Sequence, residues 1–208
     1  MPGVTRLVLA LAALLLPATL LDAAVPKGGA APGGGSLVGQ LLIAAPDLPD
    51  PSFHHAVVLV VRHSGDGGAF GIIINRPVGK VPLADLMDEI GESGTGIAGS
   101  LRVFAGGPLE PGTGFILHSA EYRRPETLPI DERVSMTSSA GILRDIGHDK
   151  GPAKTLVAFG YAGWGPGQLE AEIADHDWFT ALEDPGLVFD EDRAAVWDVA
   201  LKHRSHAL

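Results

Sequence analysis

Short runs of aliphatic residues recur along the chain from residue 37 and are separated by glycine-rich or polar segments. Residues 37–44 (LVGQLLIA) and 56–63 (AVVLVVRH) are two such runs, and a third, 69–77 (AFGIIINRP), follows the second after the segment SGDGG. Runs of this length and composition are typical of buried strands. Two of them joined by a glycine-rich turn indicate a β-hairpin.

The same pattern continues downstream, where residues 153–164 (AKTLVAFGYAGW) form the clearest buried strand of the sequence. Two further runs flank the turn PLEPGTG at residues 108–114, and WFTALED and GLVFD are short enough to be extended pieces. Besides 153–164, the predicted strands and extended pieces are 100–107, 114–119, 132–137, 178–184 and 186–190.

Helical periodicity appears first at residues 82–91 (PLADLMDEIG), where Pro82 suits the first turn and Gly91 suits the end. The apolar face of this helix comprises Leu83, Leu86, Met87 and Ile90. A second helix is predicted over residues 140–147, capped by Ser138 or Ser139, and a third over 168–175.

The last predicted helix covers residues 191–204 (EDRAAVWDVALKHR) and is capped by Asp190. Its apolar face comprises Ala195, Val196, Val199 and Ala200. Its final turn carries Lys202, His203 and Arg204, which complement the negative end of the helix dipole. Since strands cluster in hairpins with few helices between them, we predict an α+β fold. It would be a single compact domain with a large mixed, mostly antiparallel sheet, flanked by a few helices.

The N-terminus has a different character. Arg6 is followed by an uncharged apolar run of 15 residues, Leu7 to Leu21, which is shorter than the roughly 20 residues that span a bilayer. We therefore predict a signal peptide at residues 1–24, a Gly/Ala/Pro-rich linker at 25–36 and the folded domain at 37–208. The protein is then periplasmic or secreted, without a stable membrane span once the signal is removed. If the segment is not a signal, the protein is cytoplasmic.

Composition narrows the function classes. The chain of 208 residues has a formal net charge of −10 and no cysteine. An acidic body without a basic block disfavours nucleic-acid binding, which depends on Lys and Arg neutralising phosphates. The lack of cysteine excludes disulfides, thiolate catalysis and Cys-ligated zinc.

The glycine-rich segment GYAGWGPGQLEAEI, which starts at Gly160, does not fit a phosphate-binding loop. Five residues after Gly163 comes Gln168, with no Lys behind it, so the Walker motif fails, and the dinucleotide motif fails at the same position. Glu170 and Glu172 in the following helix would repel a phosphate. We expect these glycines to shape a strand-to-helix turn, with Trp164 available for packing.

This segment, together with QLLIAAPDLPDPSFHHAVVLVVRH, GAFGIIINRP and VFAGGPLEPGTGFILHS, resembles the AlgH/YqgE family of bacterial proteins. The similarity runs in order from about Gly39 to Lys202. The resemblance implies an α+β fold with a large mixed sheet and no established enzymatic activity or cofactor. Family members often carry the label of transcriptional regulator, although this sequence has no basic helix-turn-helix. They usually start near Leu37, so the N-terminal extension departs from the family.

Eight histidines are the groups that titrate near neutral pH. His54 and His55 are adjacent, so in a strand they would point to opposite faces. His63 and His118 end apolar strands and match positions where the family often has His, so they are candidates for acid-base chemistry or for half of a metal site. Zinc needs three or four ligands, and Asp66 or Glu121 would have to complete the set.

Asn75 and Arg76 end an apolar strand just before Pro77, where polar residues either cap a turn or line a cleft. The family usually shows Asn, a basic residue and Pro at these positions. We take Asn75, Arg76, Trp164 and Gln168 as the candidate binding residues. The alternative is that Arg76 locks a loop to Glu110 or Glu170.

We expect a protein that is not an enzyme and that binds a protein partner or small ligand, with no cofactor and with a regulatory role. One alternative is a small-molecule hydrolase or metal-dependent enzyme that uses His63 and His118. Another is the transcriptional regulator that the family label implies. The sequence leaves the ligand, the partner and the oligomeric state open.

Overall fold

The computed structural model describes residues 35–189 and 192–204. The predicted signal peptide, residues 1–24, lies outside these ranges, as does the predicted linker 25–36 apart from its last two residues. No helix in the described ranges has the length and apolarity needed to cross a bilayer.

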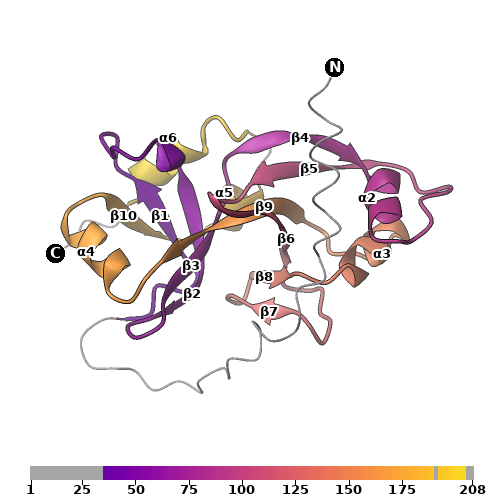
Figure 1. The fold of residues 1–208 in the computed structure, drawn as a ribbon, viewed down its shortest axis with the longest axis horizontal. Coiled ribbons are helices and arrows are strands. Elements are labelled where there is room, and N and C mark those ends of the chain that lie inside the picture. The colour runs from indigo at the N-terminus through magenta and orange to yellow at the C-terminus, as the bar shows by residue number, and fades with distance from the viewer. Residues whose placement is uncertain (1–34, 190–191, 205–208) are drawn as a thin grey trace.

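Ten strands of the described chain form one strongly curled sheet (Figure 1). Its main path runs β10-β1-β2-β3-β9-β6-β8-β7, and β5 branches from β9 to pair with β4. The strands are β1 (Gln40–Ala44), β2 (Val57–Ser64), β3 (Gly68–Ile73), β4 (Pro77–Pro82), β5 (Ser100–Ala105), β6 (Leu109–Ser119), β7 (Leu128–Pro129), β8 (Val134–Thr137), β9 (Thr155–Trp164) and β10 (Trp178–Leu182).

Strand β9 is shared by two halves of the sheet. Its C-terminal end pairs with β3, through Ala69 opposite Trp164, and so completes a first half made of β10, β1, β2 and β3. Its N-terminal part lies between β6 and β5 and completes a second half with β4, β7 and β8. The β5–β9 pairing is parallel and the other pairings are antiparallel. The predicted α+β class with a mixed, mostly antiparallel sheet is confirmed.

The glycine-rich segments bring β6 and β9 into close contact. Gly160 has a φ of 75°, and a Cβ at this position would lie 2.5 Å from the carbonyl oxygen of Gly107. Only glycine combines this backbone conformation with such a close approach. The two segments thus lie side by side as neighbouring parts of the sheet, and the predicted turn at 108–114 belongs to β6.

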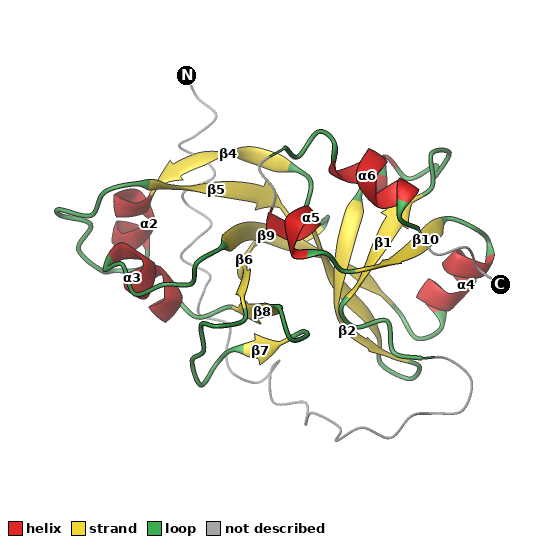
Figure 2. Cartoon of the chain, turned by 180° about the vertical axis from the view of Figure 1, so that it is seen from behind, coloured by secondary structure: helices red, strands yellow, loops and turns green. Residues whose placement is uncertain are grey.

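Helices pack on both halves (Figure 2). α2 (Leu83–Glu89) and α3 (Gly141–Gly147) cover one face of the second half, where a core cluster includes Val81, Val103 and Ile142. α4 (Gln168–Ala174) packs beside β10 and β3, α6 (Val196–Lys202) packs on β1 and β2, and α5 (Pro185–Phe189) contacts β9 near the centre. The largest core cluster draws on strands of both halves.

Two predicted elements differ in the structure. Residues 186–190 were expected to be extended, but 185–189 form α5, because Pro185 suits a first turn and Asp184 Oδ1 accepts a hydrogen bond from Gly186 N at 2.8 Å. The predicted helix over 191–204 is shorter, since α6 begins at Val196, and its predicted cap Asp190 lies outside the described residues.

The other differences concern an unpredicted strand and a cap. β4 was not predicted, because two prolines, a glycine and an exposed lysine make its sequence unlike a buried strand. The structure places it at an edge of the sheet, where these residues are tolerated. In α3, Ala140 takes the N-cap position without a side-chain cap, whereas Ser139 Oγ accepts from Gly141 N at 3.3 Å.

Candidate functional site

Trp164 lies at the end of β9 in an aromatic cluster with Phe53 and Trp178, and only 6% of it is exposed. The ring centroids of Trp164 and Trp178 are 5.6 Å apart and edge-to-face, and Phe53 stacks on Trp164 at 6.2 Å. Trp164 is one of the candidate binding residues from the sequence, but the structure buries its ring within the fold. Its ring packs the first half of the sheet against α4.

Glu172 on α4 ties this cluster together. Its Oε2 accepts hydrogen bonds from Trp164 Nε1 at 2.7 Å and from Trp178 Nε1 at 2.9 Å, and its Oε1 accepts from Gln168 Nε2 at 2.8 Å. Gln168 is exposed, but its Oε1 also accepts from Gly165 N at 3.0 Å. We call Phe53, Trp164, Gln168, Glu172 and Trp178 the aromatic end. Among the described residues, its polar groups hydrogen-bond to one another and to the backbone of Gly165, so the glycine-rich segment here serves the fold.

Asn75 and Arg76 hold the loop that precedes β2. Asn75 Oδ1 accepts from Val57 N at 2.9 Å, and its Nδ2 donates to the carbonyl oxygen of His55 at 2.8 Å. Arg76 donates to the carbonyl oxygens of Ser52 and His54, the latter at 2.9 Å. Burial lowers the pKa of Arg76, and Asp50 acts in the opposite direction. Arg76 does lock a loop, but through these carbonyls rather than through Glu110 or Glu170.

The structure does not bring His63 and His118 together. His63 pairs with Ala69 of β3, and Ala69 in turn pairs with Trp164 at the C-terminal end of β9. His118 pairs with Thr155, which lies at the N-terminal end of β9. At the usual rise of a strand, the two ends of β9 are roughly 30 Å apart. A single metal site built from both histidines is excluded by this geometry.

Each of these two histidines is engaged by its own neighbours. His63 Nδ1 accepts from Leu37 N at 3.2 Å, so Nε2 carries the proton and donates to Glu170 Oε1 at 2.8 Å. His118 is fully buried; Nδ1 donates to the carbonyl oxygen of Ser119 and Nε2 accepts from Thr137 Oγ1, both at 3.0 Å. Burial lowers the pKa of His118, which favours the neutral ring. Among the described residues, no three His, Asp or Glu side chains gather as a metal site.

His54 and His55 do not point to opposite faces of a strand, because they lie in the turn before β2. Their rings stack on each other with centroids 4.0 Å apart, and His55 stacks on Trp197 of α6 at 4.0 Å. This stack forms one wall of a pocket of about 290 Å³, which we call the histidine pocket. It is lined by His54, His55, Asn75, Arg76, Arg193, Ala194, Trp197 and Asp198.

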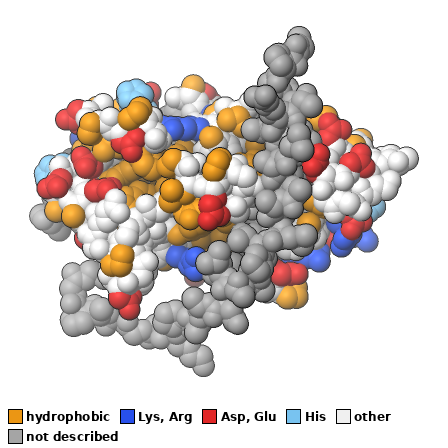
Figure 3. Space-filling model, in the orientation of Figure 1, with side chains coloured by type: hydrophobic (Ala, Val, Ile, Leu, Met, Phe, Trp, Pro, Cys, Tyr) orange, Lys and Arg blue, Asp and Glu red, His pale blue; other side chains and the backbone are white. Residues whose placement is uncertain are grey.

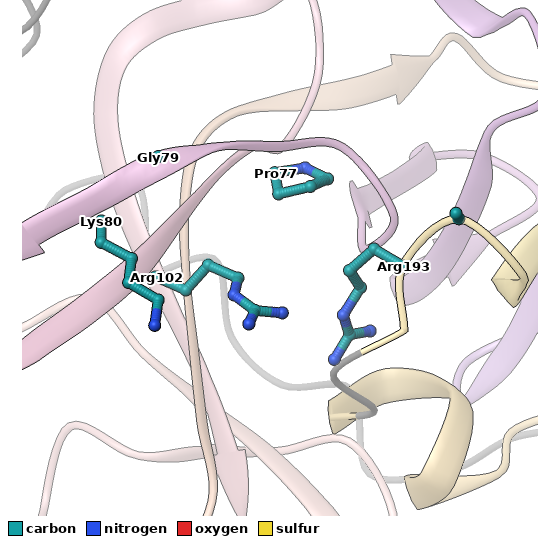
Figure 4. A pocket seen from close by; sticks show the side chains of 6 residues that line it. Pro77, Gly79, Lys80, Arg102 and Arg193 are labelled. Atoms are coloured by element: carbon teal, nitrogen blue, oxygen red, sulfur yellow. The ribbon is translucent and has the colours of Figure 1, made fainter.

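A second pocket adjoins the first and shares Arg193 and Ala194 with it (Figure 4). This cationic pocket has a volume of about 410 Å³ and is lined by Pro77, Gly79, Lys80, Arg102, Arg193 and Ala194. Figure 4 shows the guanidinium group of Arg102 lying between Lys80 and Arg193.

On the face of the molecule seen in Figure 3, acidic side chains are scattered over both ends and apolar ones gather over the middle.

Comparison with known proteins identifies a matching protein family and several relatives of this chain. The model of a family described as AlgH-like matches residues 41–207. The chain belongs to the AlgH-like family. A UPF0301 protein of Jannaschia sp. (strain CCS1) is 45% identical over 168 residues, which cover 80% of this chain and 87% of the relative. A UPF0301 protein of Methylococcus capsulatus is 40% identical over 165 residues, which cover 79% and 90%.

Two solved structures share the fold of this AlgH-like chain. The solution structure of the AlgH protein from Pseudomonas aeruginosa superposes with a TM-score of 0.67 at 34% identity, covering 84% of this chain and 93% of that one. A crystal structure of a Corynebacterium diphtheriae protein gives a TM-score of 0.63 at 23% identity, covering 80% and 86%. Both the fold and the family that the sequence motifs indicated are confirmed.

Sequence reasoning found Asn75 and Arg76 but missed the rest of the two pockets. Trp197 and Arg193 were assigned only to the last helix, and Lys80 and Arg102 belonged to no motif. The signal that could have found Lys80 was a cation between two prolines at an expected strand end, which is typical of an exposed edge.

Proposed function

We propose that this AlgH-like chain is a non-enzymatic binding protein and that the histidine pocket is its binding surface, with a regulatory role for the complex. The proposal is supported mainly by how rigidly this pocket is built. Its wall is a loop fixed by three hydrogen bonds that Asn75 and Arg76 donate, by one that Asn75 accepts from Val57 N, and by ring stacking on Trp197. Rigid loops that present aromatic and polar groups in a concavity are typical recognition surfaces.

The ligand or partner would contact groups of two kinds. His54 is exposed, stacks on His55 and lines the pocket, so it offers an aromatic ring to a ligand. Asp198 adds an exposed carboxylate from α6 to the same lining as Asn75 and Arg76, which lie between β3 and β4. A binding partner that buries an aromatic or amide plane and donates a hydrogen bond fits this combination.

The two other functions considered from the sequence gain less support. A hydrolase or metal enzyme would need chemistry at His63 or His118 separately, since they lie at different ends of β9. Direct DNA regulation would need a long basic face, because duplex binding neutralises several phosphates in a row.

The test is quantitative capture. Full-length wild-type protein and a His54→Ala/Asp198→Ala variant, immobilised equally, are exposed to extract of the native cell, and retained proteins and metabolites are compared by mass spectrometry. We expect a component that the variant loses and that a Lys150→Ala control, in the exposed loop after α3, retains. Retention by all three proteins, with unchanged melting temperatures, would show that this pocket is not the binding surface.

The compartment of the partner depends on the N-terminal segment. We propose export, so that the partner lies in the periplasm or outside the cell, on the basis of the apolar run Leu7 to Leu21. Intact mass of the protein from separated periplasmic and cytoplasmic fractions tests this. A cytoplasmic species with an uncut N-terminus would contradict it.

A further inference from the structure

Lys80 and Arg102 lie directly opposite each other on the antiparallel strands β4 and β5. Their chain neighbours Val81, which is opposite Leu101, and Val103, which is opposite Gly79, belong to the core under α2 and α3. Because side chains alternate along a strand, Lys80 and Arg102 project from the other face of this pair of strands, into the cationic pocket. Like charges placed directly opposite each other destabilise a sheet, so this pair costs the fold some stability.

A third cation is fixed at the edge of the same pocket. Arg193 Nη1 donates to the carbonyl oxygens of Leu187 and Val188, both at 2.9 Å, and its guanidinium carbon lies 5.3 Å from the ring centroid of Phe104. Only 7% of Arg193 is exposed. Its position is therefore set by the fold before any ligand arrives, which reduces the ordering cost of binding.

We propose that the cationic pocket binds a phosphorylated small molecule through its phosphoryl group. Three cations from two sheet strands and the segment before α6 converge there, in a chain whose net charge is −10. The planar guanidinium of Arg102 matches two phosphoryl oxygens at once, and the Lys80 ammonium adds a point charge beside it. An anion between Lys80 and Arg102 would remove the repulsion that their pairing creates. The volume of about 410 Å³ suits a small molecule.

Asp192, next to Arg193 in the sequence, would compete with such a ligand. Asp192 is exposed and immediately precedes Arg193. Asp192, Arg193 and Arg102 each take part in further interactions within the chain. An incoming phosphoryl group must therefore displace or share existing contacts, which limits its affinity. Neutralising Asp192 should consequently strengthen binding.

The inference concerns a different pocket from the proposed function and does not depend on it. Full-length protein is titrated calorimetrically with inorganic pyrophosphate at low salt. We expect saturable binding, weakened about 10-fold by Lys80→Gln and by Arg102→Gln and tightened about 3-fold by Asp192→Asn. Lys154→Gln, which removes an exposed lysine outside both pockets, and His54→Ala should leave the affinity within about 2-fold.

Several results would overturn the inference. These are no saturation up to about 10 mM pyrophosphate, an equal loss of affinity in Lys154→Gln, or tighter binding of citrate, which would indicate a carboxylate site. Mapping of amide chemical shifts on the wild-type protein gives a readout without any variant. Perturbations centred on Lys80, Arg102 and Ala194 support the pocket, and perturbations centred elsewhere contradict it.

Discussion

The aromatic end and the cationic pocket use polar groups in opposite ways. At the aromatic end, Glu172 receives hydrogen bonds from two tryptophans and a glutamine, so a half-buried carboxylate is matched by donors of the same chain. In the cationic pocket, Lys80 is paired across the sheet with Arg102, a residue of the same charge. The first arrangement stabilises the fold, whereas the like-charged pair opposes the pairing of its two strands.

The comparison also shows that the amino-acid composition of a segment does not by itself indicate a binding site. Trp164 and Gln168 of the aromatic end lie in a glycine-rich segment of the sequence, and both are among the candidate binding residues from the sequence. The cationic pocket has no such signature. Its residues come from β4, β5 and the segment before α6, which only the folded chain brings together.

Among the substitutions that test this comparison, replacing Trp164 by alanine is expected to have the largest effect on stability. The substitution removes a buried ring and two aromatic contacts and leaves Glu172 without one of its donors. We expect a loss of about 3–5 kcal/mol in the free energy of unfolding, measured by urea denaturation. Trp164→Phe, which keeps most of the packing, should lose clearly less. A loss within experimental error for the alanine variant would mean that the aromatic end is not structural.

Glu183 sharpens the comparison, because it is a buried carboxylate that is paired with Arg133, whereas Glu172 accepts from two tryptophans and a glutamine. Burial, followed by the nearby Asp131, raises its pKa to about 7, and Arg133, whose Nη2 lies 2.7 Å from Glu183 Oε2, opposes this rise. Between the ordinary pKa of a glutamate and 7, the folded chain keeps a proton that the unfolded chain has released. Stability should therefore fall by about 1–2 kcal/mol as pH rises through this window.

The measurement is urea denaturation from about pH 4.5 to pH 8, with Glu183→Gln as the comparison. The variant remains neutral at every pH, so its stability should lose this downward component. If wild-type and variant profiles were parallel, the carboxyl of Glu183 would titrate alike in the folded and unfolded chain.

The smallest expected effect has the opposite sign. Lys80→Gln removes the repulsion with Arg102 on an exposed edge strand, and we expect the free energy of unfolding to rise by about 0.2–1 kcal/mol at low salt. Added salt should shrink the gain, since it screens the two charges. Lys154→Gln is the matched control. A decrease in stability would show that Lys80 contributes to packing and would weaken the contrast between the two regions.

Much of the fold was predictable from local pattern. The apolar spacing in residues 82–91 gave the place of α2, and the run at 153–164 gave the place of β9, because each buries one continuous set of side chains. The prediction of an extended segment at residues 186–190 was wrong, because a short apolar run has no periodicity that distinguishes a strand from a buried helix.

The site was less predictable, because it depends on pairing between distant segments. Asn75 and Arg76 were found from their place at a strand end, yet the carbonyls that they hold belong to residues about twenty positions earlier. Lys80 and Arg102 become neighbours only through the register of β4 and β5, and β4 itself carries no strand signature.

The shared strand β9 constrains how a newly made chain acquires its structure. As the ribosome releases the chain, the β2–β3 hairpin and the antiparallel pair β4–β5 emerge first, but they have no common partner until residues 155–164 follow. β1 waits longer still for one of its neighbours, since β10 covers residues 178–182. Contacts this distant in sequence slow folding and leave strand edges open meanwhile. A nascent chain of this protein therefore stays unfinished, and accessible to chaperones, until nearly the last of its residues has been added.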